Sequence, residues 1–334
     1  MTVTVYIHIG MHKTGTSSIQ VELTRARHLI QKSGFFYPRK CMPDFAPYGQ
    51  HEVPWLVAND ETKIPENALS IWSLSPLQKR ERLEALTDEI GNSGFSKAIL
   101  SSEEFDTLDI DEIKALAEAF EGFSLVPVVF IRNLSDFVES GYRTAVVHSN
   151  YPDPIQHFAA HQRSRLDIYK MLKDWASIGS KDHIIVASYD DPHLKADAVT
   201  SFLRLLGLTA ADIEPQRLPL QNESYPAFIV EMLRTVRNGV MNAEYRNHWE
   251  NHLLQKEFNR NTRSRYTLMP PSLKNQLDSL YMEELNQIAR DSDIAEKIVG
   301  SLIIPETPGR VFLSDFSDVL RAYDTEVRSR GMNV

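Results

Sequence analysis

The chain has 334 residues, of which 42% are hydrophobic and 24% charged, a composition that predicts a globular protein with a well-buried core. The formal net charge of −9 argues against a protein that binds nucleic acid over its whole surface, since such proteins are usually basic. Cys41 is the only cysteine, so no intramolecular disulfide can form, which fits a reducing compartment.

The sequence offers no segment for membrane insertion or export. No run approaches the ~18 apolar residues that a membrane span needs. The chain opens MTVTVYIHIG, without the basic leader of a signal peptide. We therefore expect a cytoplasmic protein with no stable membrane insertion.

The first predicted elements are a strand, a loop and a helix. Alternating apolar and β-branched residues predict a strand over Thr2–Ile9, and Gly10–Thr16 reads as a loop. Apolar residues at helical spacing predict a helix over Ser17–Lys32. Phe35–Asn67 holds five prolines and several aromatic residues, and we expect it to be irregular.

The following segments alternate between helices and strands. Helices are predicted over Leu77–Ile90, Ile110–Phe120, Ser135–Val147, Arg165–Trp175 and Ala196–Leu206, and strands over Lys97–Ser101, Leu125–Ile131 and His183–Ala187. This alternation predicts βαβ units and a three-layer α/β core over residues 1–215, with helices on both faces of a parallel sheet. Beyond residue 215 the patterns indicate helices and loops only, so residues 216–334 are expected to be a helical region packed on the core within one continuous domain.

The strand–loop–helix junction reads HIGMHKTGTSS over residues 8–18. Gly10 and Gly15 have the separation of a Walker A loop, GxxxxGK[ST], but Thr16 stands at the lysine position and Lys13 comes three residues earlier. Two glycines let backbone N–H groups converge on an anion, and the helix that follows directs its positive end to the same place. The junction therefore predicts a phosphate-binding loop of altered chemistry.

The KTGTS pattern resembles the 5′-phosphosulfate loop of sulfotransferases that use 3′-phosphoadenosine 5′-phosphosulfate (PAPS), and HIGMHKTGTSSIQ resembles the loop of bacterial members. The resemblance implies a P-loop-type fold, PAPS as cosubstrate, its desulfated product PAP, and no required metal. The loop residues it implies for cosubstrate binding are Gly10, His12, Lys13, Thr14, Gly15, Thr16, Ser17 and Ser18.

A second motif supports the same family. In it, a strand ends in an arginine and a serine follows eight residues later, and both bind the 3′-phosphate. Here IRNLSDFVESGYR supplies Arg132 and Ser140, with Leu134 where many members have proline. An arginine at the carboxyl end of a central strand suits a phosphate dianion. VASYDD resembles the family's tyrosine-acidic segment, in which Tyr189 would contact adenine or simply pack at a strand end. QNESY, with Asn222 and Ser224, is a looser likeness to a loop of bacterial members.

The resemblance implies that Lys13 neutralises the bridging oxygen as the sulfuryl group leaves. The acceptor also needs a base, and carboxylate or imidazole are the usual choices. Glu103 follows the strand over Lys97–Ser101 and should emerge at the same sheet edge as Lys13, within AILSSEEF, which resembles a strand-end segment of bacterial members. His51 and His12 are the rivals, and the sequence leaves the choice open.

Other readings of the chain remain. A nucleotide kinase or NTPase with ILSSEE as a Walker B-like strand is the alternative enzyme, and a non-catalytic nucleotide-binding module is the third candidate. The partner is expected to be a small-molecule or saccharide acceptor with a hydroxyl or amine, with no nucleic acid involved, while the oligomeric state stays open. The pairs His157/His161 and His248/His252 lack a third metal ligand, and the basic run Lys256–Arg265 is a solvated surface or an anion-binding segment.

Overall fold

The computed structural model describes most of the chain, namely residues 2–11, 13–179, 184–192, 197–209, 225–239, 247, 250–253, 265–296, 298–299 and 310–328. The chain forms two compact units, and each takes segments from several parts of the sequence. Unit 1 comprises Met1–Arg132, Asp167–Gln221 and Glu283–Ile304, and unit 2 comprises Asn133–Leu166, Asn222–Met282 and Pro305–Val334.

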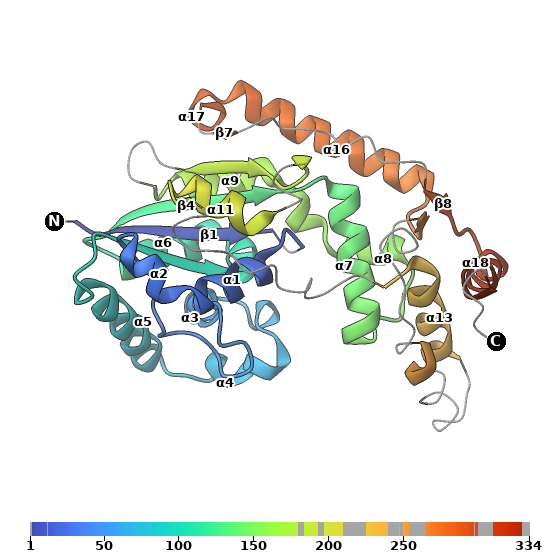
Figure 1. The fold of residues 1–334 in the computed structure, drawn as a ribbon, viewed down its shortest axis with the longest axis horizontal. Helices are drawn as coiled ribbons and strands as arrows, with labels where there is room; N and C mark the ends of the chain where they lie inside the picture. The colour runs from blue at the N-terminus through green and yellow to red at the C-terminus, as the bar shows by residue number, and fades with distance from the viewer. Residues whose placement is uncertain are drawn as a thin grey trace. The chain divides into compact units, whose positions relative to one another are not determined.

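Unit 1 is built on a parallel sheet (Figure 1). In order across the sheet, its strands are β2 (Phe35–Phe36), β3 (Lys97–Ser102), β1 (Thr4–Gly10), β4 (Ser124–Ile131), β5 (Ile185–Ser188) and β7 (Ile298–Val299), each parallel to its neighbour. The chain leaves β1 towards β2 on one side and leaves β3 towards β4 on the other. The carboxyl ends of β1 and β3 therefore flank a topological switch point, where α/β sheets bind their ligands.

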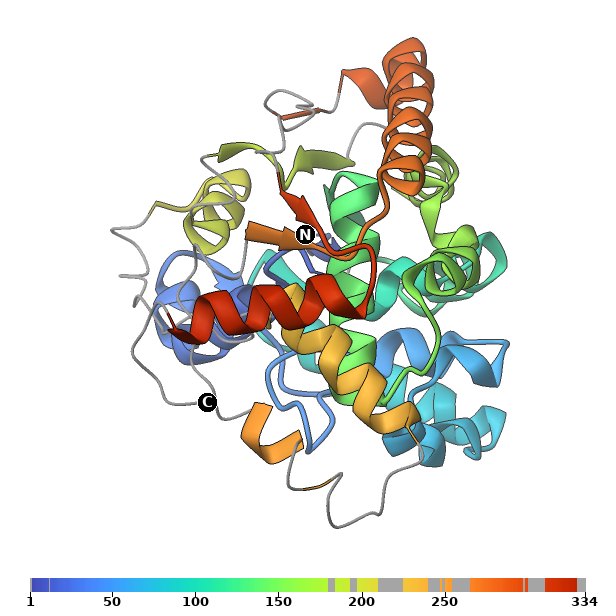
Figure 2. The same ribbon diagram turned by 90° about the vertical axis from the view of Figure 1, so that its right-hand side faces the viewer.

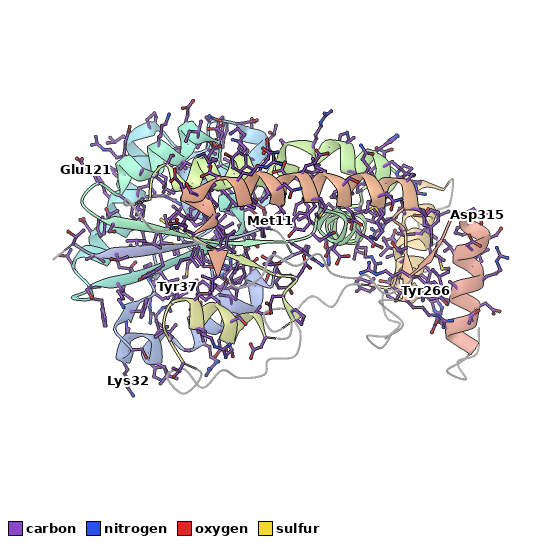
Figure 3. All side chains as sticks on the ribbon, turned by 90° about the horizontal axis from the view of Figure 1, so that it is seen from above. Met11, Lys32, Tyr37, Glu121, Tyr266 and Asp315 are labelled. Atoms are coloured by element: carbon purple, nitrogen blue, oxygen red, sulfur yellow. The ribbon has the colours of Figure 1, made fainter. Side chains whose placement is uncertain are left out.

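Helices cover both faces of this sheet, which Figure 3 shows edge-on. The helices on the first face are α1 (Thr16–Arg25), α2 (Arg27–Lys32) and α11 (Ala198–Leu205). Their fully buried side chains, such as Ile19 and Phe202, pack with Val128 and Phe130 of β4. This contact fixes the start of α1 above the end of β1.

The second face is covered by α6 (Ile110–Ala119) and α9 (Ile168–Ala176), with α5 (Pro76–Gly91) and α3 (Glu52–Val57) packed beside α6. Both α5 and α6 begin with a capping box, in which the N-cap side chain and the third helical residue satisfy each other's backbone N–H groups. The Trp175 ring of α9 meets the Phe105 ring edge-on at 5.9 Å, so this core reaches the segment that follows β3.

Unit 2 is mainly helical (Figure 2). It contains α7 (Leu134–Ser149), α8 (Ile155–His161), α13 (Ala227–Asn238), α18 (Phe316–Arg328) and the strand pair β6 (Tyr266–Thr267) and β8 (Val311–Phe312). In Figure 2, α13 (gold) lies beside α18 (red). Buried Glu139 of α7 forms ion pairs with Arg143 and Arg310, so its charge is compensated within the unit.

The remaining short elements complete the described chain. They are α4 (Leu69–Trp72), α17 (Ser292–Ala295) and four 3₁₀ segments, Glu61–Lys63, Glu66–Ala68, Glu103–Thr107 and Arg163–Leu166. The 20-residue helix α16 (Pro271–Arg290) contributes its first residues to unit 2 and its last to unit 1.

The predicted three-layer fold with a parallel sheet is confirmed, and the predicted strand–loop–helix junction forms as β1, loop and α1. The predicted helix over Ser17–Lys32 is two helices, because the chain bends at the fully buried Ala26. The helix predicted from Arg165 begins instead at Ile168, where Asp167 caps it by accepting the N–H of Lys170.

Two regions contain secondary structure that the sequence did not predict. The segment predicted to be irregular, Phe35–Asn67, contains β2 and α3. The region beyond residue 215 was expected to lack strands, yet it supplies β6, β7 and β8. Each of these strands is only two residues long and forms by pairing with a segment distant in sequence. Two residues are too few to show the alternating pattern from which a strand is predicted.

Candidate active site

The loop after β1 has the backbone shape of an anion-binding turn. Lys13 and Gly15 both have left-handed φ angles, 71° and 80°. A side chain on Gly10 would place its Cβ 2.8 Å from the Thr16 hydroxyl oxygen, so only glycine fits at the end of β1. Thr14 is buried and donates its hydroxyl to the carbonyl of Met11 at 2.6 Å, which closes the turn. His12 lies outside the described residues.

The first turn of α1 follows this loop directly. Gly15 is its N-cap and has no side chain to cap the helix, and no acidic residue occupies the first turn. The helix therefore directs its N-terminal backbone donors and its positive dipole end towards the loop. Ser17 and Ser18 are partly exposed there, whereas Thr16 is buried. This end of the helix suits a negatively charged group.

The end of β3 brings a second group of polar residues beside the loop. Its register with β1 sets Ser101 opposite His8 and Ser102 opposite Ile9. His8 is fully buried, its Nδ1 lies 2.8 Å from the Ser101 hydroxyl, and burial lowers its pKa to about 3. His8 is therefore a neutral structural residue at neutral pH.

Glu103 and His51 meet at this strand end. The loop before α3 is held there because Gln50 and Ser101 exchange two hydrogen bonds of 2.9 Å each. This clamp places the buried imidazole of His51 with its Nδ1 2.9 Å from the Ser102 hydroxyl and 3.8 Å from Glu103 Oε2. The expectation that Glu103 emerges beside the loop carrying Lys13 agrees with the neighbouring positions of β1 and β3.

Lys13 and Glu103 carry opposite charges and interact electrostatically at this edge of the sheet. In Figure 3 the label of Met11, two residues before Lys13, shows where the loop lies. Burial lowers the pKa of the Lys13 ammonium, the negative charge of Glu103 opposes that shift, and the positive charge of Arg132 adds to it. A partly desolvated lysine that interacts with both a carboxylate and a guanidinium is a strong electrostatic partner for an incoming anion.

Arg132 and Tyr189 complete the edge on the other side of β1. Arg132 follows β4 and donates Nη1 to the Lys13 carbonyl at 2.7 Å, while its guanidinium lies 5.5 Å from the centre of the Tyr189 ring. Within the described residues, the buried Nε of Arg132 has no hydrogen-bond partner. A Cβ on Gly15 would lie 3.4 Å from the Tyr189 ring, so this ring borders the loop.

Ser140 lies on α7 and belongs to unit 2, where its carbonyl accepts the Thr144 hydroxyl at 3.2 Å. Asn222 and Ser224 lie outside the described residues, as do Lys256, Arg260, Arg263 and His248. Arg265, the last residue of the basic run, forms an ion pair with Glu326. Among the described residues there is no group of three or more His, Cys, Asp or Glu side chains placed to hold a metal, and no helix long and apolar enough to cross a membrane.

Sequence reasoning missed Gln20, the residue that joins α1 to the base candidates. Gln20 is fully buried and donates Nε2 to Glu103 Oε2 at 2.8 Å. The sequence signal for this role was the presence of a long polar residue directly after Ile19, on the face of α1 that packs on the sheet. Such a residue in a buried stripe indicates a specific polar partner.

Comparison with known proteins gives matches only among solved structures. No protein-family model and no curated protein matches the chain. A sulfotransferase from Alicyclobacillus acidocaldarius is 13% identical over 76% of this chain and 96% of its own, with a TM-score of 0.41. The sulfotransferase domain from the curacin biosynthetic pathway is 10% identical over 84% and 98%, with a TM-score of 0.43. Mouse sulfotransferase SULT7A1, complexed with PAP, is 12% identical over 88% and 87%, with a TM-score of 0.37.

Proposed function

We propose that this chain transfers a sulfuryl group from PAPS to a hydroxyl or amine of a small-molecule or saccharide acceptor. The loop over residues 10–18 binds the 5′-phosphosulfate, and Arg132 with Ser140 binds the 3′-phosphate. Lys13 stabilises the leaving phosphate, Glu103 takes the acceptor's proton, and Tyr189 borders the adenine. The reaction forms an S–O or S–N bond to the acceptor as the sulfur–oxygen bond to PAP breaks.

The observation that carries this proposal is that Lys13, in the loop after β1, and Glu103, directly after the adjacent strand β3, interact electrostatically. In-line transfer of a charged group needs a cation at the leaving oxygen and a base at the attacking atom. Lys13 belongs to the loop that cradles the anion, and its electrostatic coupling to Glu103 reflects their proximity. One edge thus carries both groups that the reaction requires.

An ordinary NTPase finds less support in the same loop. Thr16 stands at the Walker lysine position and is buried, and its hydroxyl lies 2.8 Å from where a Cβ on Gly10 would be. It is packed against the end of β1 and cannot reach along a triphosphate as the Walker lysine does.

Cosubstrate binding is the most direct test. By calorimetry, PAP should bind without added Mg²⁺ and at least about tenfold more tightly than ATP, a difference of about 1.4 kcal/mol. The reason is that the proposed site offers separate donors for a 5′- and a 3′-phosphate. ATP binding that equals or exceeds PAP binding and depends on Mg²⁺ would favour the kinase or NTPase. Incubation with labelled PAPS and a panel of acceptors then identifies the product, and labelled product excludes a purely binding module.

Arg132→Ala should reduce the preference for PAP over AMP, which lacks the 3′-phosphate. A hydrogen bond to a charged group contributes about 1.5–3 kcal/mol, so the ratio of the two affinities should fall by about tenfold or more. Arg132 also donates a hydrogen bond to the Lys13 carbonyl, so its removal can disturb the phosphate loop and weaken the binding of both PAP and AMP. The ratio separates the two effects, and an unchanged ratio would remove Arg132 from the 3′-phosphate site.

A further inference from the structure

Gln20 makes a buried polar contact that packing alone does not require. It is the fifth residue of α1, one turn beyond the phosphate loop, and is fully buried. Its Nε2 donates to Glu103 Oε2 at 2.8 Å, while its buried Oε1 has no partner among the described residues. Because an unpartnered buried oxygen is unfavourable, an apolar side chain would suit the core better. The contact with Glu103 is what the glutamine adds.

A glycine lets two polar side chains approach the same carboxylate. A Cβ on Gly49 would lie 2.9 Å from Gln20 Cδ and 2.7 Å from His51 Nε2. His51 in turn has its Nδ1 3.8 Å from Glu103 Oε2. Because Gly49 has no side chain, the Gln20 amide and the His51 imidazole can both approach Glu103 Oε2.

We propose that Gln20 is a positioning residue that orients the Glu103 carboxylate and favours its ionised form, in which it can accept a proton. An amide N–H donated to a carboxylate stabilises the charged state. Because Gln20 and the loop of Lys13 lie at the start of one helix, α1 also fixes the base relative to the leaving-group cation. This inference rests on the proposed role of Glu103 as the base.

Several other groups interact with the Glu103 carboxylate, and a substitution at Gln20 leaves them unchanged. Glu103 interacts electrostatically with Lys13 of the loop, His8 of β1, and Tyr37 and Tyr48 of the segment before α3. His51 faces it from the residue that precedes α3. A variant that changes Gln20 alone leaves all five in place, so a shift in the titration of the base reports the amide.

The test is the pH dependence of turnover in wild type, Gln20→Met and Gln20→Glu. Methionine keeps the length and removes the donor, so the acid limb should move up by about one pH unit. Glutamate places a second carboxylate against the first, and the limb should move further, by about two units. Gln31→Met on α2 is the matched control and should leave the limb unchanged. A purely structural role would lower turnover equally at every pH, and an unshifted acid limb in both variants overturns the inference.

Gly49→Ala provides a test that leaves Gln20 intact. The new Cβ would lie within 3.0 Å of the Gln20 and His51 side chains, so one or both must shift and their contacts with Glu103 should weaken. Circular dichroism and a melting curve close to those of wild type would show that the fold persists. The acid limb should again move to higher pH, and no movement counts against the inference. Failure of the proposed function looks different, because wild type would then form no sulfated product, or Glu103→Gln would turn over normally.

Discussion

Lys13→Ala is expected to lower turnover by about 100-fold or more while PAP binds within about tenfold of wild type. In the proposed mechanism the lysine meets charge that develops on the leaving phosphate only during transfer, and removal of one such preorganised donor typically costs a factor of 10²–10³. The backbone N–H groups of the loop and the end of α1 remain to bind the ground-state anion. Steady-state turnover with calorimetry on the same samples separates the two effects.

Two control variants test whether the effect of Lys13→Ala depends on the positive charge and on its position in the loop. Lys13→Arg keeps a cation and should recover part of the lost turnover, whereas Lys32→Ala, an exposed lysine on α2 that Figure 3 labels, should leave turnover unchanged. Because burial lowers the pKa of Lys13, the ammonium loses its proton at a lower pH than an ordinary lysine. In wild type, kcat/KM for PAPS should therefore fall on the alkaline side before pH ~10.4, because this parameter reports the free enzyme. Turnover of Lys13→Ala within about threefold of wild type would show that this lysine does not stabilise the leaving group.

The sequence was sufficient to predict the loop and the sheet edge on which it lies. Gly10 and Gly15, Lys13 between them and an apolar strand before them are local signals, and local patterns predict local structure well. The parallel arrangement of the sheet was also implied by the alternation of strands with helices, whereas the order of the strands comes from the structure. Together these features predict that Lys13, Glu103 and Arg132 lie at the carboxyl edge of the sheet.

Long-range contacts were not predictable in the same way. The distance between His51 and Glu103 depends on the two hydrogen bonds by which Gln50 holds an otherwise irregular loop to Ser101. The hydrogen bond from Gln20 to Glu103 joins residues 83 apart in sequence. The assignment of Ser140 to a different unit from Arg132 reflects contacts of α7 with α8 and α13, which no pattern within α7 encodes.

The structure changes how the two candidate bases relate to each other. The sequence offered Glu103 and His51 as alternatives, yet they are neighbours whose nearest polar atoms are 3.8 Å apart. The imidazole is buried and contacts the Ser102 hydroxyl, whereas the Glu103 side chain keeps 23% of its surface exposed. Of the two side chains, the carboxylate is therefore the more accessible from solvent, which favours it as the proposed base.

Glu103→Gln is therefore expected to lower turnover by about 100-fold or more, with PAP binding unchanged, because general bases contribute roughly 10²–10⁴ to rates. The substitution preserves shape, and the new amide oxygen can still accept the Gln20 hydrogen bond, so the fold should persist. Wild-type turnover should rise with pH as the carboxylate ionises, and this acid limb should disappear in the variant.

Glu104→Gln, one residue further along the 3₁₀ segment, is the matched control and should retain the limb. His51→Ala should lower turnover less than Glu103→Gln does, since it removes only a neighbour of the proposed base. If Glu103→Gln turns over nearly normally while His51→Ala is inactive, His51 is the base and the assignment of Glu103 is wrong.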